Sequence, residues 1–266
     1  MVAGYYIGNI SGIVVATSAV ALGVLSEAAY IGIKVRPILR DQLKKQPKSY
    51  PILTRSSFLK YYIPLAMTSL ITLISQPLIS TASSRMPRAL DSLAIWPVLS
   101  GLLFLFRSPG VAYNEVVVSL MEKPGAYTSL RKFAQFITAA TTGFLLIVVS
   151  TPAARIWFIE ITSLPASLYP LARTALWFSL LVPGASTLQS WFQGILLHSG
   201  HTRGIPEAVG IFLFSTIILY IVGILTAITP GIYIGTIGFS LGMTLQAIWL
   251  KQKSRSVMTN HQERSD

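Results

Sequence analysis

Residues 208–250 read AVGIFLFSTIILYIVGILTAITPGIYIGTIGFSLGMTLQAIWL and hold no charged side chain. An α-helix rises 1.5 Å per residue, so about 20 apolar residues cross a hydrocarbon layer of roughly 30 Å. The stretch is about twice as long as one such helix requires, and Thr229-Pro230-Gly231 divides it with residues typical of a turn. It therefore predicts a hairpin of two membrane-spanning helices.

Five further apolar stretches precede this hairpin, at about residues 5–33, 61–83, 93–120, 133–153 and 168–197. Pro183-Gly184 predicts a kink near the middle of the last one. A backbone in hydrocarbon must satisfy its own hydrogen bonds, which favours helices, and these runs are too long for barrel strands. Only 11% of the residues are charged and 52% are hydrophobic, whereas soluble domains carry about 25% charged residues. We therefore expect an all-α integral membrane protein with about seven transmembrane helices.

The positions of lysine and arginine predict how the chain is oriented in the membrane. Sixteen lysine and arginine residues lie on one side of the membrane according to the order of the spans, in residues 34–60, 121–132, 203 and 251–264. Only Arg85, Arg88 and Arg155 lie on the other side. Basic loops concentrate on the cytoplasmic side, so we expect the N-terminus outside and the C-terminus in the cytoplasm, in the plasma or inner membrane. The net charge of +12 then fits contact with the lipid bilayer and argues against a nucleic-acid partner.

The same pattern divides the chain into four parts. Residues 1–33 are expected to form one helix, residues 34–60 a basic cytoplasmic linker, and residues 61–250 a six-helix transmembrane lobe. Residues 251–266 are short and polar and are expected to be a disordered cytoplasmic tail.

Charged groups inside a bilayer are costly, so each one is a functional hypothesis. The third span carries Arg107 and Glu115, a little over two helical turns apart and so on roughly one side of the helix. Arg107 is interpreted as a contact for an anionic substrate or as part of a gating ion pair. Two alternatives stay open. One is a structural pair, either Arg107–Glu115 or one with another helix, and the other is a snorkelling Arg107 with Glu115 at the interface.

Uncharged polar residues also occur within several spans. Thr72 and Gln76 lie in the second, and Gln189 and Gln193 in the fifth. They are candidates for the lining of a substrate or ion pathway, although such residues also serve packing between membrane helices.

No pattern of an enzyme is present in the sequence. It has no GxxxxGK[ST] phosphate loop, no Ser/His/Asp set and no paired carboxylates at a shared depth. His198 and His201 have Glu207 as the only acid nearby, which does not predict a metal site. We therefore predict no catalytic activity, no cofactor and no metal.

The end of the fifth span resembles a family motif. Residues 191–206 read WFQGILLHSGHTRGIP. The aromatic pair, Gly194, the small pair ending at Gly200, and Thr202-Arg203 resemble the multidrug and toxic compound extrusion (MATE) transporters, whose superfamily includes flippases of lipid-linked polysaccharide intermediates. Residues 62–66, 76–79 and 93–97 look like the first helix of such a lobe and its link to the next, and residues 36–40 are similar to a linker between lobes.

This resemblance implies a membrane transporter that moves a small solute or lipid-linked molecule by alternating access between two six-helix lobes. The motif would lie at the cytoplasmic face of the fourth helix of its lobe. Residues 61–250 would be the C-terminal lobe, and the first span would be the last helix of a preceding lobe outside this partial chain. The partner lobe would be a separate N-terminal lobe or a second copy.

One departure from the family narrows the expected substrate. Family members driven by sodium or protons often carry acidic residues in the first helix of the C-terminal lobe, and residues 61–83 have none. The chain therefore looks more like a flippase or an exporter of anionic solutes, such as the progressive ankylosis-type exporters. The alternative is a non-transporting membrane scaffold or inactive transporter fragment, because one lobe alone cannot form an alternating cavity.

Overall fold

The computed structural model describes residues 12–38, 40, 55–200 and 202–262, and every regular element within them is helical. The chain divides into two units, residues 1–54 and residues 55–266. The first unit contributes α2 (Gly12–Ile38), of which residues 17–37 are long and apolar enough to cross a membrane. Large apolar side chains recur along α2, among them Leu22 and Leu25. Such a composition suits a helix within a lipid bilayer.

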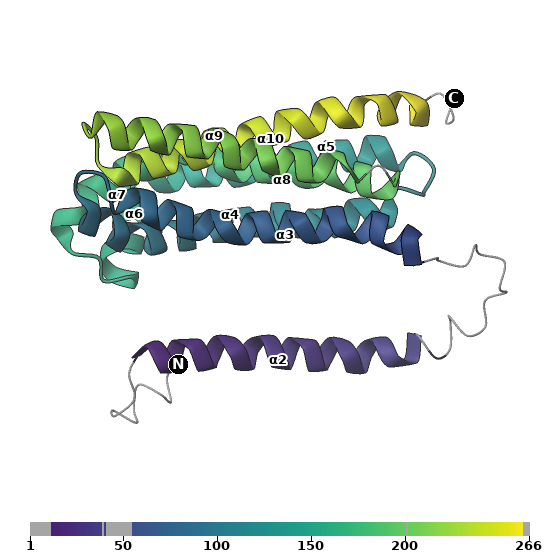
Figure 1. Ribbon diagram of the computed structural model, residues 1–266, viewed down its shortest axis with the longest axis horizontal. Coiled ribbons are helices and arrows are strands. Elements are labelled where there is room, and N and C mark those ends of the chain that lie inside the picture. The colour runs from purple at the N-terminus through teal and green to yellow at the C-terminus, as the bar shows by residue number, and fades with distance from the viewer. Residues whose placement is uncertain (1–11, 39, 41–54, 201, 263–266) are drawn as a thin grey trace. The chain divides into compact units, whose positions relative to one another are not determined.

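The second unit is a helical bundle. In chain order its described elements are α3 (Arg55–Ser83), α4 (Ala89–Leu120), α5 (Ala126–Ser150), the short turns α6 (Ala153–Arg155), η2 (Ile156–Ile161) and η3 (Ala166–Leu168), then α7 (Tyr169–Phe178), α8 (Val182–His198), α9 (Gly204–Thr226) and α10 (Gly231–Gln262). The long helices of this unit run side by side (Figure 1).

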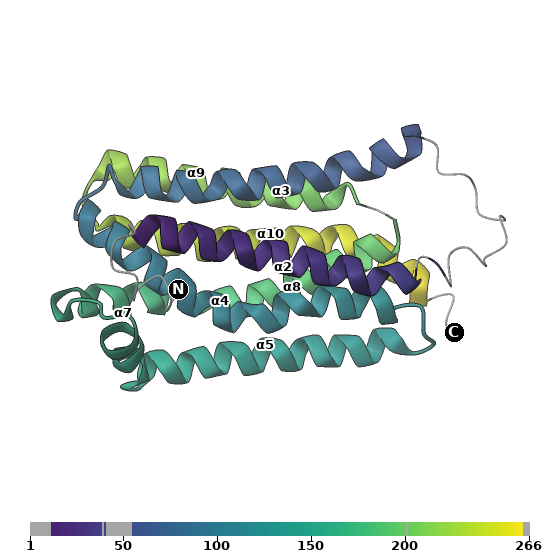
Figure 2. The ribbon, with the colours of Figure 1, turned by 90° about the horizontal axis from the view of Figure 1, so that it is seen from below.

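Helix α8 is the centre of the bundle. Thirteen of its 17 residues are buried, because α8 packs against α4, α5 and α10. Helix α9 packs against α10 and α3. Figure 2 shows α5 and α9 on opposite sides of the bundle, with α4, α8 and α10 between them.

The surface of the bundle suits a lipid environment. Helices α4, α5 and α9 and residues 231–255 of α10 are, like α2, long and apolar enough to cross a membrane. Large apolar side chains are exposed on them, among them Phe104, Phe136, Phe144, Phe214 and Leu225. Exposed apolar area on this scale is covered by lipid in a membrane protein. The chain thus has the features of an all-α, multi-pass membrane protein, as the sequence predicts, while seven crossings and their orientation stay predictions.

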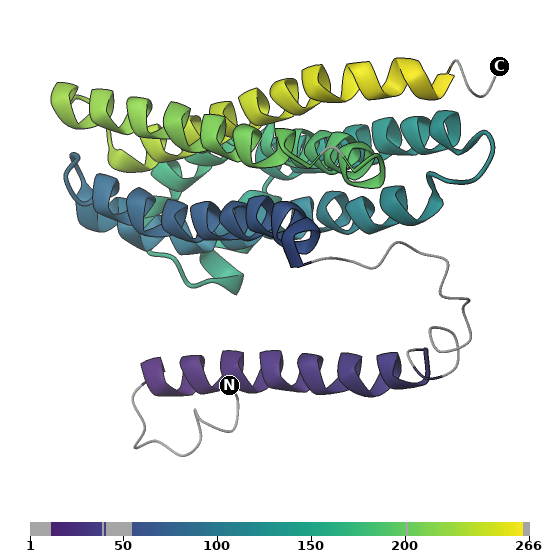
Figure 3. The same ribbon diagram turned by 45° about the vertical axis from the view of Figure 1, so that its right-hand side comes forward.

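The two ends of the bundle differ in charge. The start of α3, the α4–α5 turn, the α8–α9 turn and the last turns of α10 share one end, which we name the basic end (Figures 1 and 3). The α3–α4 turn, residues 151–168 and the α9–α10 turn share the opposite end. Hydrogen bonds agree with this arrangement, since the Gly231 N–H of α10 donates to the Pro87 carbonyl at 3.2 Å. Within residues 55–266, the described turns that the sequence assigns to one side of the membrane therefore share one end of the bundle.

The predicted hairpin is confirmed. Helices α9 and α10 pack against each other and are joined by residues 227–230, the position of the turn signature. Helix α9 ends at Thr226, and its C-cap residue Ala227 adopts a left-handed φ of 47°.

The fifth predicted span is two helices, α7 and α8, and the expectation of one kinked helix was wrong. The break covers residues 179–181, and α8 begins at Val182, one residue before Pro183. Proline has no N–H to give the Ser179 carbonyl, so the Val182 N–H donates to it at 3.0 Å and tightens the chain into a turn. The Ser179 hydroxyl, fully buried, donates to the Ala175 carbonyl at 3.0 Å.

Three boundaries also differ from the prediction. Helix α5 begins at Ala126, before Arg131, and α3 begins at Arg55, inside the expected linker. The tail expected to be disordered from residue 251 continues α10 through Gln262. Residues 251–262 contain neither glycine nor proline. Lys253 also pairs with Glu207 of α9 at 2.8 Å, and both features favour continuation of the helix past Leu250.

Candidate functional site

Arg107 lies near the middle of α4 and beside a cavity. Thirteen residues separate it from the end of the helix at Leu120, a rise of about 20 Å. The cavity holds about 390 Å³ and is lined by Trp96, Pro97, Ser100, Gly101, Leu103, Phe104 and Arg107 of α4 and Phe239 of α10. This volume is in the range of small-molecule sites.

The guanidinium group of Arg107 lies over an aromatic ring. Its Cζ is 5.4 Å from the centroid of Phe239, a cation–π distance. Phe239 in turn makes edge contacts with Trp96 and with Phe212, whose ring centroids are 6.0 Å and 5.7 Å away. The aromatic cluster thus fixes one face of the guanidinium and leaves its N–H groups to find acceptors elsewhere.

No acceptor for the Arg107 Nε occurs within the described residues, although that atom is buried. Glu115 is exposed and makes no ion pair with Arg107 in this part of the chain. The structural Arg107–Glu115 pair is therefore not formed here. A half-buried cation without a counter-charge is costly in a membrane protein, which makes Arg107 the strongest candidate for binding an anion.

Proline and glycine beside Arg107 shape the helix locally. Helix α4 remains continuous through Pro109, whose missing N–H would have bonded the Leu105 carbonyl. The Ser108 hydroxyl donates to that carbonyl at 2.9 Å instead, so it does not become a free cavity acceptor. Gly110 abuts α8, because a Cβ there would lie 2.6 Å from the Thr187 Oγ1. This close contact fixes the position of Arg107 along α4 relative to the residues of α8.

The polar pathway candidates divide into different environments. Gln189 is buried, and its Nε2 donates to the Met243 carbonyl at 2.8 Å and to the Gln246 Oε1 at 3.2 Å, so it joins α8 to α10. Gln193 is half-buried, and neither glutamine lines the cavity beside Arg107. The side chains of Thr72 and Gln76 on α3 lie outside the described residues.

The family-like motif ends α8 and begins α9. Gly194 meets α4 so closely that a Cβ would lie 2.6 Å from the Val117 Cγ1. Gly200 has a φ of +75°, the left-handed conformation with which many helices end. Thr202 is buried, and its carbonyl accepts the Ile205 N–H at 3.1 Å, while Arg203 is exposed as the N-cap of α9. These contacts give the motif a structural part in the turn; His201 lies outside the described residues.

Sequence reasoning missed Phe239 and Trp96 as site residues. Both come from apolar runs in which no aromatic residue stands out, and Phe239 reaches Arg107 only because α10 packs beside α4. The bundle and this cavity define the class: an all-α, multi-pass membrane protein with an arginine-bearing cavity between its helices. Comparison with protein-family models, with curated proteins and with solved structures finds no match to the chain. The family resemblance therefore stays a prediction.

Proposed function

We propose that this chain is a membrane transporter of the MATE-like flippase superfamily, and that it moves a small anionic solute or an anionic lipid-linked molecule by alternating access. The observation that carries the proposal is Arg107. Its guanidinium borders a cavity of about 390 Å³ near the middle of a membrane-length helix, and no described carboxylate neutralises it. A substrate anion would supply the missing counter-charge.

The broken helix supports the same proposal. Transporters commonly form their sites with discontinuous membrane helices, whose interrupted backbone provides hinges and free polar groups. The break between α7 and α8 lies within the apolar bundle, and α10, which carries Phe239, packs against both halves. A change of angle at residues 179–181 would therefore act on the wall of the Arg107 cavity.

Alternating access also needs a second lobe against which the first one moves. The proposal assigns this part to a further lobe or to a second copy of the chain. Reconstitution of the chain alone tests the second-copy arrangement directly, since flux would then require no additional polypeptide.

The test is transport by the purified chain in liposomes, with two substrate probes. Uptake of radiolabelled citrate reports an anionic solute, and dithionite quenching of NBD-labelled phosphatidylglycerol reports lipid flipping. We expect flux in one of these assays and a loss of about 10- to 100-fold in Arg107→Gln, because a hydrogen bond to a charged group contributes roughly 1.5–3 kcal/mol. Arg107→Lys should retain part of the flux.

Arg155→Gln is the matched control, since Arg155 is an exposed cation at the end of the bundle opposite the basic end, away from the Arg107 cavity. It should transport like the parent chain. Equal flux in Arg107→Gln and the parent would remove Arg107 from the pathway. A well-folded chain with no flux in either assay, alone or with an added lobe, would favour the non-transporting scaffold.

A further inference from the structure

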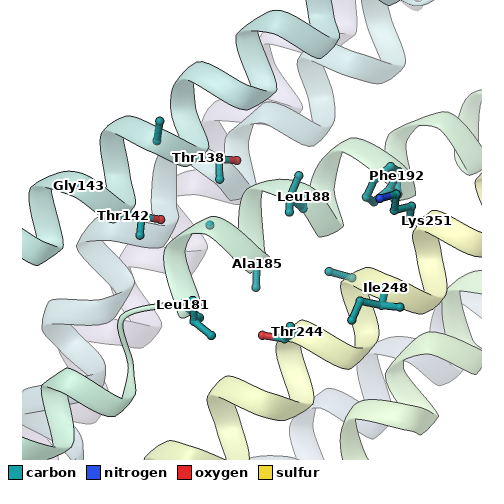
Figure 4. A pocket seen from close by; sticks show the side chains of 13 residues that line it. Thr138, Thr142, Gly143, Leu181, Ala185, Leu188, Phe192, Thr244, Ile248 and Lys251 are labelled. Carbon is teal, nitrogen blue, oxygen red and sulfur yellow. The ribbon is translucent and has the colours of Figure 1, made fainter.

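A second cavity lies on another face of the bundle, where α5, α8 and α10 meet. It holds about 510 Å³. Figure 4 shows Thr138, Thr142 and Gly143 of α5 on one side and Thr244 and Ile248 of α10 on another. Ala185 and Leu188 lie along α8, and Leu181 lies in the turn just before it. None of these residues belongs to the cavity beside Arg107.

Small residues create this space, and carbon lines most of it. Ala139, Gly143, Ala185 and Ala247 stand where larger side chains would fill the gap between the helices. A Cβ added at Gly143 would meet no atom within 4 Å. The hydroxyl oxygens of Thr138 and Thr142 are buried, so these residues present little polar surface. The cavity therefore suits a hydrocarbon chain.

The apolar cavity continues into a polar one towards the basic end. A neighbouring cavity of about 250 Å³ shares Leu188, Phe192 and Lys251 with it. The polar cavity adds Arg131 of α5 and Arg255 of α10, together with Tyr127 and Gln135. No aspartate or glutamate lines either cavity. We name the two together the α5–α8–α10 groove.

We infer that the α5–α8–α10 groove binds one anionic phospholipid, with an acyl chain in the apolar cavity and its phosphate beside Arg131, Lys251 and Arg255. Basic pockets between helices at a membrane surface are suited to anionic head groups. Arginine adds paired donors that match phosphate oxygens. A soluble anion would leave the apolar cavity empty, and a zwitterionic lipid would bring no net negative charge to the basic side chains of Arg131 and Lys251.

The bound lipid would have a definite mechanical effect. Helices α5 and α10 both pack against α8, and the groove lies between them. An acyl chain in the groove would touch both helices and the Leu181 turn at the α7–α8 break. Because the lipid binds the folded chain, it should raise the unfolding temperature by mass action.

The experiment uses the purified full chain in detergent, read by native mass spectrometry and thermal unfolding. Three probes are compared: phosphatidylglycerol, phosphatidylcholine with the same acyl chains, and inorganic phosphate. We expect one phosphatidylglycerol to remain bound and to raise the unfolding temperature. The other two probes should leave the chain unoccupied and its unfolding temperature unchanged. This outcome does not depend on transport, so it can fail or succeed separately from the proposed function.

Two variants test the two parts of the groove. Arg131→Gln with Lys251→Gln should weaken phosphatidylglycerol binding about 30-fold, since each basic group near an anionic surface contributes roughly 5-fold. Its control is Lys123→Gln with Lys132→Gln, which removes two exposed charges at the same end. Gly143→Leu should block the acyl chain, and its control is Gly210→Leu on α9, where a Cβ also meets nothing within 4 Å.

Three results would overturn the inference. If phosphatidylcholine remained bound as well as phosphatidylglycerol, the charge of the head group would not determine binding. If inorganic phosphate raised the unfolding temperature as much as phosphatidylglycerol, the groove would be a site for a free anion. Equal losses in each variant and its control would show that general surface charge or helix substitution causes the effect. Each variant should keep the parent's unfolding temperature without added lipid, which separates lost binding from lost folding.

Discussion

The glycine at position 194 lies where α8 packs tightly against α4. A Cβ there would lie 2.6 Å from the Val117 Cγ1, and Val117 is fully buried. We predict that Gly194→Ala lowers the free energy of unfolding by about 1–3 kcal/mol, the usual cost of overpacking a tight contact. Thermal or denaturant unfolding of the purified chain measures this change.

A compensating substitution separates steric overlap from other causes. Val117→Ala removes the Cγ1 atom that the new Cβ would meet at 2.6 Å and keeps the Val117 Cβ, which would lie at 2.7 Å. The double variant should therefore recover only part of the lost stability. Gly210→Ala is the control: its Cβ meets nothing, and alanine is the better helix former. A Gly194→Ala chain as stable as Gly210→Ala would show that the helices can separate here at little cost.

Two residues, Arg107 and Gln189, show how much of the candidate site could be predicted from the sequence. The cost of a charge in hydrocarbon makes Arg107 a candidate site residue. The structure places a cavity beside it, and its part in binding stays a prediction. Gln189 was selected by the same polarity argument, yet its amide is used in packing α8 against α10. Polarity within a span identifies residues that need a partner, and only the packing of helices decides whether that partner is protein or substrate.

At the scale of elements, the apolar runs placed most helices, because their length reflects the thickness of the membrane. The break at residues 179–181 could not be read from Pro183 alone. A proline removes one donor, and whether the helix bends or breaks depends on which neighbour bonds the freed carbonyl. Here the Val182 N–H takes the Ser179 carbonyl, and the chain turns. Charge patterning likewise did not reveal that α10 continues past Lys251.

The break makes a prediction about Pro183. Pro183→Ala restores an N–H that can bond the Ser179 carbonyl, so it favours a continuous helix over the turn. We expect an unfolding temperature equal to or above that of the parent, and a flux reduced several-fold if the break works as a hinge. Pro206→Ala is the control, because Pro206 lies in the first turn of α9, where no break occurs. Unchanged flux in Pro183→Ala would make the break structural only.

For the whole molecule, the sequence lacks cysteine, which allows its orientation to be mapped without background labelling. Ser84 and Lys123 are exposed and lie in turns at opposite ends of the bundle. We predict that Ser84→Cys reacts with a membrane-impermeant maleimide in intact cells and that Lys123→Cys reacts only after permeabilisation. The expectation follows from the basic end facing the cytoplasm.

The reverse pattern of labelling would place the basic end outside. Labelling of both cysteines in intact cells would contradict a single orientation of the chain. Arg155→Cys should behave like Ser84→Cys, since it is exposed at the same end, and it provides an independent check of the outer side.

No carboxylate within the described residues pairs with Arg107, and under the proposed function this has an electrical consequence. If α4 crosses the membrane, Arg107 near its middle lies within the transmembrane voltage, where moving one elementary charge the whole way involves about 2.3 kcal/mol per 100 mV. Once a monovalent anion is bound, the loaded site is neutral and its movement does no electrical work. The empty site keeps its positive charge, so the voltage acts on the return half of the cycle. The transport rate of such a protein would depend on the membrane potential as well as on the substrate gradient.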